Sequence, residues 1–237
     1  MHKKKAKKPK YGLQAPKELL VFVLLTIVFL IAFIFISTLW KYFFLAGFIY
    51  FLYTTIRILV GSTNWARERL NKFIVTECKA KKGMKILDVG CGGGSLSIAF
   101  AKQIKEGEVW GIDIWKKGDL LGNAPERTLE NIKIEGVENI VKIKSADARN
   151  IPFPDNYFDI VSSVFTLHNI HPDREKAIFE MIRVLKPGGI LAIVNPMIWW
   201  LKYDIIPKLP KGKRLINLHS KRYFLIKLFL AEKERNF

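Results

Sequence analysis

The longest uncharged apolar run in the chain constrains its fold more than any other feature. It covers eighteen residues, Leu19–Ile36, and a helix that is apolar on every face offers water no polar side. A short break, Ser37–Lys41, leads to a second apolar run, Tyr42–Val60, which only Arg57 interrupts. Both runs approach the roughly 20 residues that cross a hydrocarbon core about 30 Å thick. Residues 19–61 are therefore predicted to form a hairpin of two transmembrane or membrane-embedded helices.

Two other interpretations of this region are weaker. A cleaved signal peptide fits poorly, because no small-x-small cleavage motif follows Ile36 and a second apolar run does. A hairpin buried in the core of a soluble domain is the other alternative, and the length of the first run disfavours it. The sequence leaves open whether the two helices cross the bilayer fully or form a re-entrant hairpin.

The chain is strongly basic, with 39 Lys and Arg against 21 Asp and Glu, a formal net charge of +18. Such a charge favours a polyanionic neighbour, either nucleic acid or anionic lipid headgroups. Residues 1–18 form a basic tail, and its first part, Met1–Lys10, holds six lysines and no acid and is expected to be solvated and disordered. Lys41 is the only basic residue in the loop between the two apolar runs. The positive-inside rule therefore places the tail, and everything after the hairpin, in the cytoplasm beside anionic headgroups.

From residue 62 to residue 237 the sequence has the pattern of an α/β domain. Apolar strand-like runs alternate with helical segments, which predicts a Rossmann-like, mostly parallel sheet with helices on both faces. The predicted strands are Lys85–Val89, Val109–Ile114, Val141–Ser145, Phe158–Val164 and Gly189–Val194. The predicted helices are Asn64–Lys79, Ser95–Lys105, Asn123–Glu135 and Asp173–Leu185. Two cysteines are too few for a disulfide framework, which suits a reducing, cytosol-facing compartment.

A glycine-rich turn follows the first predicted strand of this domain. Its spacing is D-x-G-x-G-x-G, from Asp88 through Gly90 and Gly92 to Gly94. Ser95 breaks the G-x-G-x-x-G pattern of a dinucleotide site, and the Gly-Lys-Ser/Thr of a phosphate-binding loop is absent. Glycines let a ligand lie against main-chain amides, and an acid just before the turn would repel a pyrophosphate. The turn therefore favours a ligand with an ammonium group and no phosphate.

Two further acids lie at the ends of the next two predicted strands. Asp113, near the end of the second strand, can accept hydrogen bonds from both hydroxyls of a ribose, and Asp147, after the third, can accept one from an adenine amino group. An Asp at a strand end often caps a helix or a turn instead. Three such acids at the ends of successive strands favour a shared ligand.

Four segments, LDVGCGGG, GIDIW, SADARNIPFPDNYFDIVSS and RVLKPGGILAIV, resemble the successive motifs of class I S-adenosylmethionine (SAM)-dependent methyltransferases. The resemblance is to the small-molecule and lipid branch that includes ubiquinone-biosynthesis-like enzymes, and it covers roughly residues 81–196. It implies SAM as the cofactor.

The resemblance also implies a role for each residue of the donor site. The methionine part of SAM would be held by Asp88 and by the turn that contains Gly90, Cys91, Gly92 and Gly94. The ribose would bind Asp113, with Ile114 packed on the adenine. The adenine edge would be read by Asp147 and the Ala148 amide, and the site would be lined after the fourth strand by Val164 and Phe165.

The acceptor side of the site is less defined. Transfer from a sulfonium needs alignment of donor and acceptor and exclusion of water, and it needs a base only if the acceptor atom starts protonated. The segment after the fourth strand lacks the Asn/Asp-Pro-Pro-aromatic run of DNA and protein N-methylating sites. His168 is a weak candidate base, and packing or capping is its alternative. His168 and His171 have no evident third ligand, so no metal site is expected. Cys91 is interpreted as a small residue that fits the turn.

The C-terminal region supplies a second membrane signal. In Asn195–Arg214, aromatic and aliphatic residues are interleaved with lysines, which is typical of a membrane interface, although a partly buried loop has a similar composition. The apolar stretch Arg222–Glu232 is expected to return as an antiparallel edge strand, completing a shortened version of the family's seven-stranded sheet.

The leading hypothesis is a membrane-anchored enzyme that methylates a hydrophobic small molecule or lipid. A nucleic-acid methyltransferase is disfavoured, because the basic residues concentrate beside the apolar runs. A SAM-binding membrane scaffold or sensor without turnover stays open, because the motifs bind the donor and not the acceptor.

Overall fold

The structure, a computed structural model, describes residues 7–13, 16–36, 38–116, 118–196, 215–223 and 226–235. The chain divides into two compact units. The hairpin unit comprises Gly12–Arg67 and Lys116–Asn123, and the domain unit comprises the chain up to Tyr11, Glu68–Trp115 and the chain from Ala124 onward.

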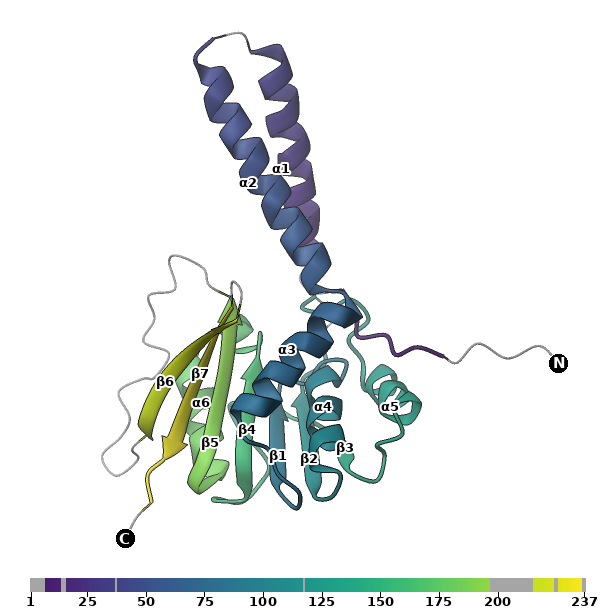
Figure 1. The fold of residues 1–237 in the computed structure, drawn as a ribbon, viewed down its shortest axis with the longest axis vertical. Helices are drawn as coiled ribbons and strands as arrows, with labels where there is room; N and C mark the ends of the chain where they lie inside the picture. The colour runs from purple at the N-terminus through teal and green to yellow at the C-terminus, as the bar shows by residue number, and fades with distance from the viewer. Residues whose placement is uncertain are drawn as a thin grey trace, which may run out of the picture. The chain divides into compact units, whose positions relative to one another are not determined.

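The hairpin unit contains the two predicted apolar helices, α1 (Pro16–Phe35) and α2 (Trp40–Gly61), which lie side by side (Figure 1). The two helices approach each other closely at Gly47, where an added Cβ would come within 2.1 Å of the Phe29 ring. Phe29 also packs against Phe51, with ring centroids 5.1 Å apart. No residue of α1 is buried.

The remainder of the hairpin unit packs at the start of α1. The amide of Leu121 donates to the Leu13 carbonyl at 3.0 Å, and the guanidinium of Arg67 donates to the Gly12 carbonyl. Gly12 has a φ of +80°, and a Cβ there would lie 2.6 Å from the Leu121 oxygen. Glycine is therefore required where the chain turns into α1.

Among the described residues of the domain unit, one seven-stranded sheet has the order β3-β2-β1-β4-β5-β7-β6. The first five strands pair in parallel and the last two antiparallel, as Figure 1 shows. The sheet confirms the predicted fold class. The strands are β1 (Lys85–Val89), β2 (Glu108–Asp113), β3 (Val141–Ser145), β4 (Phe158–Val164), β5 (Leu185–Pro196), β6 (Leu215–Tyr223) and β7 (Ile226–Lys233).

Most of the stretch Arg222–Glu232 returns as an antiparallel strand, as expected, but the shortened sheet and the edge position are wrong. β7 lies between β5 and β6, and β6 forms the edge. Leu228 and Leu230 of β7 are buried in the cluster that α3 and α4 also join. The stretch read as one strand spans the end of β6 and most of β7. The interfacial segment predicted at Asn195–Arg214 lies outside the described residues beyond Pro196, so its role stays a prediction.

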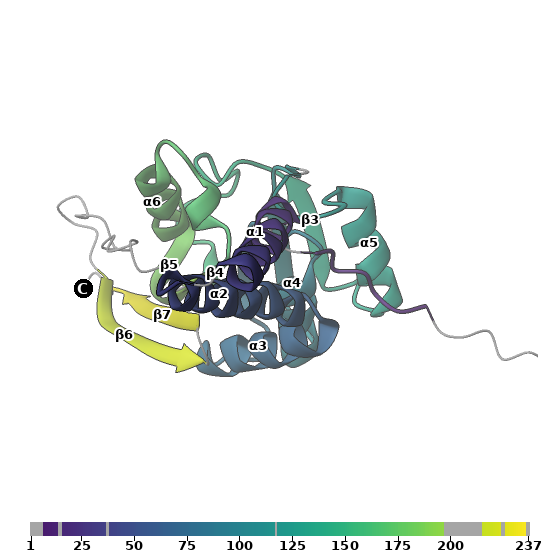
Figure 2. The same ribbon diagram turned by 90° about the horizontal axis from the view of Figure 1, so that it is seen from above.

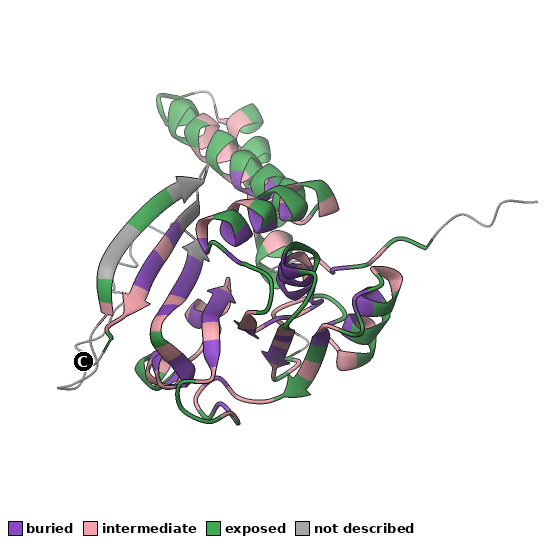
Figure 3. Ribbon diagram, turned by 60° about the horizontal axis from the view of Figure 1, so that its bottom comes forward, coloured by how far each residue is buried: buried purple, intermediate pink, exposed green. Residues whose placement is uncertain are grey.

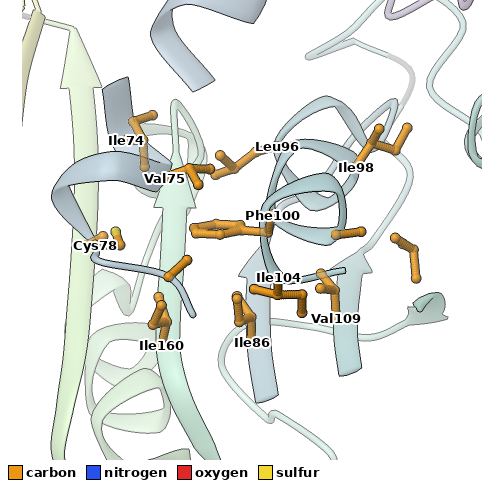
Figure 4. Close-up of a cluster of buried hydrophobic side chains, with 14 of the residues drawn as sticks. Ile74, Val75, Cys78, Ile86, Leu96, Ile98, Phe100, Ile104, Val109 and Ile160 are labelled. Carbon is orange, nitrogen blue, oxygen red and sulfur yellow. The ribbon is translucent and has the colours of Figure 1, made fainter. Parts of the chain in front are cut away.

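Helices cover both faces of the sheet, as predicted (Figure 2). One face carries α3 (Asn64–Glu77), α4 (Ser95–Ile104) and α5 (Pro125–Ile134), whose apolar side chains join one buried cluster. Figure 4 shows Phe100 of α4 between the α3 residues and the strands in that cluster. The other face carries α6 (Arg174–Val184), which contributes Ala177, Ile178, Met181, Ile182 and Val184 to a second cluster.

The central strands are buried on both faces, which explains their continuous apolar sequences. In β1, Ile86 belongs to one cluster and the adjacent Leu87 to the other, and both are fully buried. Colouring by burial separates these strands from the two hairpin helices, which are mostly exposed (Figure 3).

The described end of the basic tail is packed and not disordered, contrary to expectation, although Lys7, Lys8 and Lys10 are exposed as expected. Lys7 pairs with Glu130, and the Lys10 amide donates to the Asn131 Oδ1 atom at 2.8 Å. Tyr11 is only 6% exposed and joins the cluster under α4 and α5. An aromatic residue at the end of the lysine-rich segment and a buried amide on α5 thus order the part of the tail that the structure describes.

Candidate functional site

The glycine-rich turn lies where β1 ends and α4 begins. Gly90, Gly92 and Gly94 have φ values of +76°, +49° and +78°. The amides of Gly90 and Cys91 donate to the Ile112 carbonyl of β2 at 2.8 and 3.1 Å. A Cβ on Gly90 would lie 2.1 Å from the Thr166 hydroxyl. Positive φ and close packing together explain the glycines of the turn.

Asp88, the predicted acid before the turn, is buried beneath it, with 2% of its surface exposed. The Ser97 hydroxyl donates to its Oδ2 atom at 2.7 Å, and the Ser162 hydroxyl lies 3.4 Å from its Oδ1 atom. Burial raises the pKa of Asp88 to about 6, and the Ser97 hydrogen bond offsets part of that rise. Asp88 therefore joins β1, α4 and β4 under the turn.

Asp113 ends β2 directly beside the turn. Its Oδ2 atom accepts the Gly92 amide at 2.9 Å, and its Oδ1 atom accepts the Trp115 amide at 2.6 Å. The next side chain, Ile114, is apolar and 60% exposed. A half-buried carboxylate followed by an exposed apolar side chain is suited to a sugar hydroxyl pair and a flat ring.

Asp147 follows β3, and its loop is tied to β2 because the Ala146 amide donates to the Asp113 carbonyl at 3.1 Å. The Arg149 guanidinium contacts both carboxylate oxygens, from Nε at 3.1 Å to each and from a terminal nitrogen at 2.6 Å. The Arg149 side chain holds the pKa of Asp147 below its ordinary value. The adjacent Ala148 is buried.

The end of β4 and the segment after it lie beside the glycine-rich turn. Val164 is half-buried, and the Phe165 amide donates to the Val194 carbonyl at 2.8 Å with φ at +53°. The Thr166 hydroxyl lies 3.3 Å from the Gly90 carbonyl. The structure thus places Phe165 and the glycine turn on neighbouring segments of the same sheet edge.

His168 lies in the short 3₁₀ turn Leu167–Asn169 and is half-buried. His171 is exposed, and its ring nitrogen lies 3.2 Å from the Arg174 guanidinium. Across the part of the chain that the structure describes, no group of three or more His, Cys, Asp or Glu residues could hold a metal ion.

Both cysteines are free and buried. Burial and the nearby Asp88 and Asp113 raise the pKa of the Cys91 thiol well above its ordinary value. A thiol that stays protonated is a poor nucleophile, so the geometry favours the interpretation of Cys91 as a small residue that fits the turn.

Two residues of α5 that the sequence analysis did not single out also hold the turn. The Thr128 hydroxyl donates to the Gly92 carbonyl at 2.6 Å, and the Asn131 side-chain amide donates to the Gly93 carbonyl at 2.9 Å. Both side chains are buried, and they are spaced i, i+3 on one helix face. Polar residues at that spacing beside the buried Ile132 are the signal that could have identified them.

Comparison with known proteins fits this geometry. The model of a family described as a methyltransferase domain matches residues 87–193. The chain is 43% identical over 124 residues to UbiE, the ubiquinone/menaquinone biosynthesis C-methyltransferase of Neisseria meningitidis, covering 52% of this chain and 47% of that protein. UbiE of Bordetella avium is 37% identical over 156 residues, covering 61% and 56%. The domain unit carries a class I SAM-dependent methyltransferase domain.

The fold of this methyltransferase domain is also found in a solved structure. A SAM-dependent methyltransferase from Aquifex aeolicus superposes with a TM-score of 0.52 at 22% identity, covering 71% of this chain and 97% of that one. The chain spans about half the length of the curated relatives it matches.

SAM fits the residues that the methyltransferase domain presents. Three carboxylates lie at or near the ends of successive parallel strands, and no phosphate-binding motif accompanies them. Ile114 leaves 60% of an apolar side chain open beside the Asp113 carboxylate, where a purine ring would cover it.

Proposed function

We propose that this protein is a membrane-anchored methyltransferase that transfers the methyl group of SAM to a hydrophobic small molecule or lipid. One combination of features carries the proposal: a methyltransferase domain whose turn and carboxylates suit SAM is joined, in one chain, to two long apolar helices. A nucleic-acid substrate or a polar metabolite would give no reason for those helices.

The donor roles are assigned to residues around the turn. Asp88 and the turn of Gly90, Cys91, Gly92 and Gly94 hold the methionine part, and Asp113 binds the ribose. Ile114 packs on the adenine, whose edge Asp147 and the Ala148 amide read. Val164 and Phe165 line the site beside the sulfonium. Bound SAM supplies an activated methyl group, so the chain itself has to orient two reactants and exclude water.

The acceptor is proposed to be a quinone-type ring or a lipid. The UbiE relatives are named for C-methylation in quinone biosynthesis, and 43% identity over 124 residues supports a related ring here. An acceptor carbon that starts protonated needs a base. His168, on the turn after β4, is assigned this role because it follows Phe165 and Thr166 along the edge that holds the glycine turn.

Membrane attachment is proposed for the hairpin unit. The apolar windows of α1 and α2 are 0% and 11% buried, so their side chains need an apolar solvent. Basic residues flank both outer ends, with Lys7 to Lys10 before α1 and Arg67 and Arg69 after α2. This pattern supports a domain that faces the cytoplasm and anionic headgroups.

Calorimetry on detergent-purified full chain tests the donor site. We expect wild type to bind SAM at micromolar concentration and Asp113→Ala to bind at least about ten-fold more weakly, which is about 1.4 kcal/mol. Glu138→Ala is the matched control, because it removes one exposed acid from the same unit. Absence of binding by folded wild type would overturn the proposal.

Membrane extracts incubated with labelled SAM test turnover. Label in the organic phase supports a lipid or quinone acceptor. Label in nucleic acid, or donor binding without any transfer, would replace the proposed function with one of its alternatives. A His168→Ala variant that keeps its affinity for SAM and loses turnover would support His168 as the base. Full turnover by this variant would exclude His168 from that role.

A further inference from the structure

Lys10 and Tyr11, which lie ahead of the first apolar helix, pack beside the donor turn. Residues 7–11 belong to the domain unit, although Gly12, the next residue, begins the hairpin unit. The donor roles proposed above do not include this segment.

Asn131 connects the segment to the turn. Its side-chain nitrogen donates to the Gly93 carbonyl at 2.9 Å and to the Lys10 carbonyl at 3.1 Å, and its Oδ1 atom accepts the Lys10 amide at 2.8 Å. The residue is 1% exposed. One buried side chain thus pairs with Lys10 as a neighbouring strand would, and it also holds Gly93.

Tyr11 covers Gly93 directly. A Cβ on Gly93 would lie 3.1 Å from the Tyr11 Cα atom and 3.2 Å from its carbonyl oxygen, so the two backbones touch. The Tyr11 hydroxyl donates to Glu135 at 3.1 Å, and Glu135 pairs with Lys102 of α4. The Tyr11 side chain therefore fixes the segment to α5 while its backbone rests on the turn.

These contacts act on the peptide units next to the donor carboxylate. The Gly92 amide donates to Asp113, the Gly92 carbonyl accepts from Thr128, and the Gly93 carbonyl accepts from Asn131. Movement of Gly93 would change the orientation of the Gly92 peptide and, through it, of the Asp113 carboxylate. The segment can therefore alter the donor site without touching SAM.

We propose that Asn131 and the backbone of Lys10–Tyr11 form a clamp that positions the donor turn for SAM. Asn131 is a positioning residue in this assignment, which rests on the proposed function. The segment ahead of the membrane helices is then part of the cofactor site, and SAM affinity depends on it.

Lys10→Pro is the sharpest test, because proline lacks the backbone amide that donates to Asn131. Lys8→Pro, in the same exposed tail, is the matched control. Asn131→Ala removes all three hydrogen bonds and is compared with Lys133→Ala, an exposed position on the same helix. In each full-length variant, SAM affinity is measured by calorimetry, and the melting temperature and the kcat and KM for transfer are recorded.

We expect Lys10→Pro to weaken SAM binding about five-fold and Asn131→Ala about ten-fold or more, as loss of buried hydrogen bonds. The KM for SAM rises in proportion while kcat at saturating SAM is retained, and both controls match wild type. Unchanged affinity in Lys10→Pro and Asn131→Ala, with wild type binding SAM, would overturn the clamp alone. Failure of wild type to bind SAM would instead overturn the proposed function. If Asn131→Ala unfolds, Lys10→Pro decides the question.

Discussion

Each of the three carboxylates assigned to the donor site is already engaged by groups of the protein. Asp88 accepts the Ser97 hydroxyl, Asp113 accepts two backbone amides, and Asp147 is paired with Arg149. The environment of Asp88 affects its ionisation, whereas the partner of Asp147 affects access by the proposed ligand. The two effects can be measured separately.

Asp88 gives the folded protein a pH dependence. Its pKa rises from 3.8 to about 6 on burial, so the folded state holds the proton more tightly than the unfolded chain does. The contribution of this group to stability is therefore greatest below about pH 4 and is lost as the pH rises through about 6. A shift of this size corresponds to about 3 kcal/mol.

Asp88→Asn removes that dependence, because the amide does not ionise. Urea unfolding from pH 4 to 7 should show a free-energy difference between variant and wild type that grows with pH by up to about 3 kcal/mol in favour of the variant. Glu138→Gln, at an exposed position, should leave the wild-type profile unchanged. Parallel profiles for wild type and Asp88→Asn would show that Asp88 does not titrate in this range.

Arg149 competes with the ligand proposed for Asp147. The guanidinium and the Arg149 amide contact both carboxylate oxygens and leave little acceptor capacity for an adenine amino group. Because both side chains are more than one-third exposed, the ion pair contributes at most about 1 kcal/mol. Arg149→Gln should therefore tighten SAM binding about two- to five-fold by calorimetry, and Arg149→Lys should give a smaller change. Weaker binding by Arg149→Gln would mean that the arginine orients Asp147 for the ligand.

At the scale of the element, the turn after β1 depends on a close approach by the segment after β4. Gly90 has a φ of +76°, and its Cβ would lie 2.1 Å from the Thr166 hydroxyl. Gly83 has a similar φ of +84° with nothing within 4 Å of its Cβ. A substitution at Gly83 therefore introduces backbone strain alone, whereas one at Gly90 introduces strain and a steric clash.

Gly83→Ala should cost about 1 kcal/mol of stability and keep SAM binding. Gly90→Ala should cost more and weaken SAM binding at least about ten-fold, because the turn must move away from Thr166. Thermal unfolding and calorimetry on the two variants measure both effects. Equal effects in the two variants would show that strain alone governs the turn.

The helical hairpin depends on one small residue. Gly47→Leu would place side-chain atoms where the Phe29 ring lies, whereas Gly61→Leu on the same helix meets nothing within 4 Å. Cysteines at positions 22 and 51, whose rings are 6.1 Å apart, should cross-link across the hairpin. Gly47→Leu should lower the yield of this disulfide cross-link several-fold, because close backbone approach needs a small residue. Gly61→Leu should leave the yield of the cross-link unchanged. Equal yields would mean that the helices adjust around the added side chain.

At the scale of the whole molecule, two forces could hold the protein on a membrane: its net charge of +18 and its two apolar helices. Salt separates them, because the Debye length falls to about 3 Å at 1 M and charge attraction is screened. Insertion of apolar helices is unaffected by salt.

We expect the full chain to remain with sedimented membranes after a wash at about 1 M salt, and to be released only by detergent. Immunoblots of the pellet and supernatant measure the partition. Replacement of Ile31, half exposed in the middle of α1, by lysine should move part of the protein to the soluble or aggregated fraction. Release of wild type by salt alone would mean that the charge, and not the hairpin, holds the protein at the membrane.

Local sequence determined most of the domain's elements. The bounds of β1, β3 and β4 match the prediction, because β1 and β4 are mostly apolar runs and β3 alternates apolar with polar residues. Both apolar helices were found from run length alone. Most of β6 was missed, because the polar residues of this edge strand give no clear apolar alternation.

The sequence by itself determined the chemistry of this protein: the D-x-G-x-G-x-G turn, the acids after successive strands and the apolar runs are all local patterns. Only the tertiary structure decided which groups hold these residues. Asn131 forms hydrogen bonds with both Gly93 and Lys10, and Thr166 lies too close to Gly90 for any side chain there. Arg149 forms an ion pair with Asp147. Most of these partners lie tens of residues apart or more, and their pairing depends on packing that neither propensity nor spacing encodes.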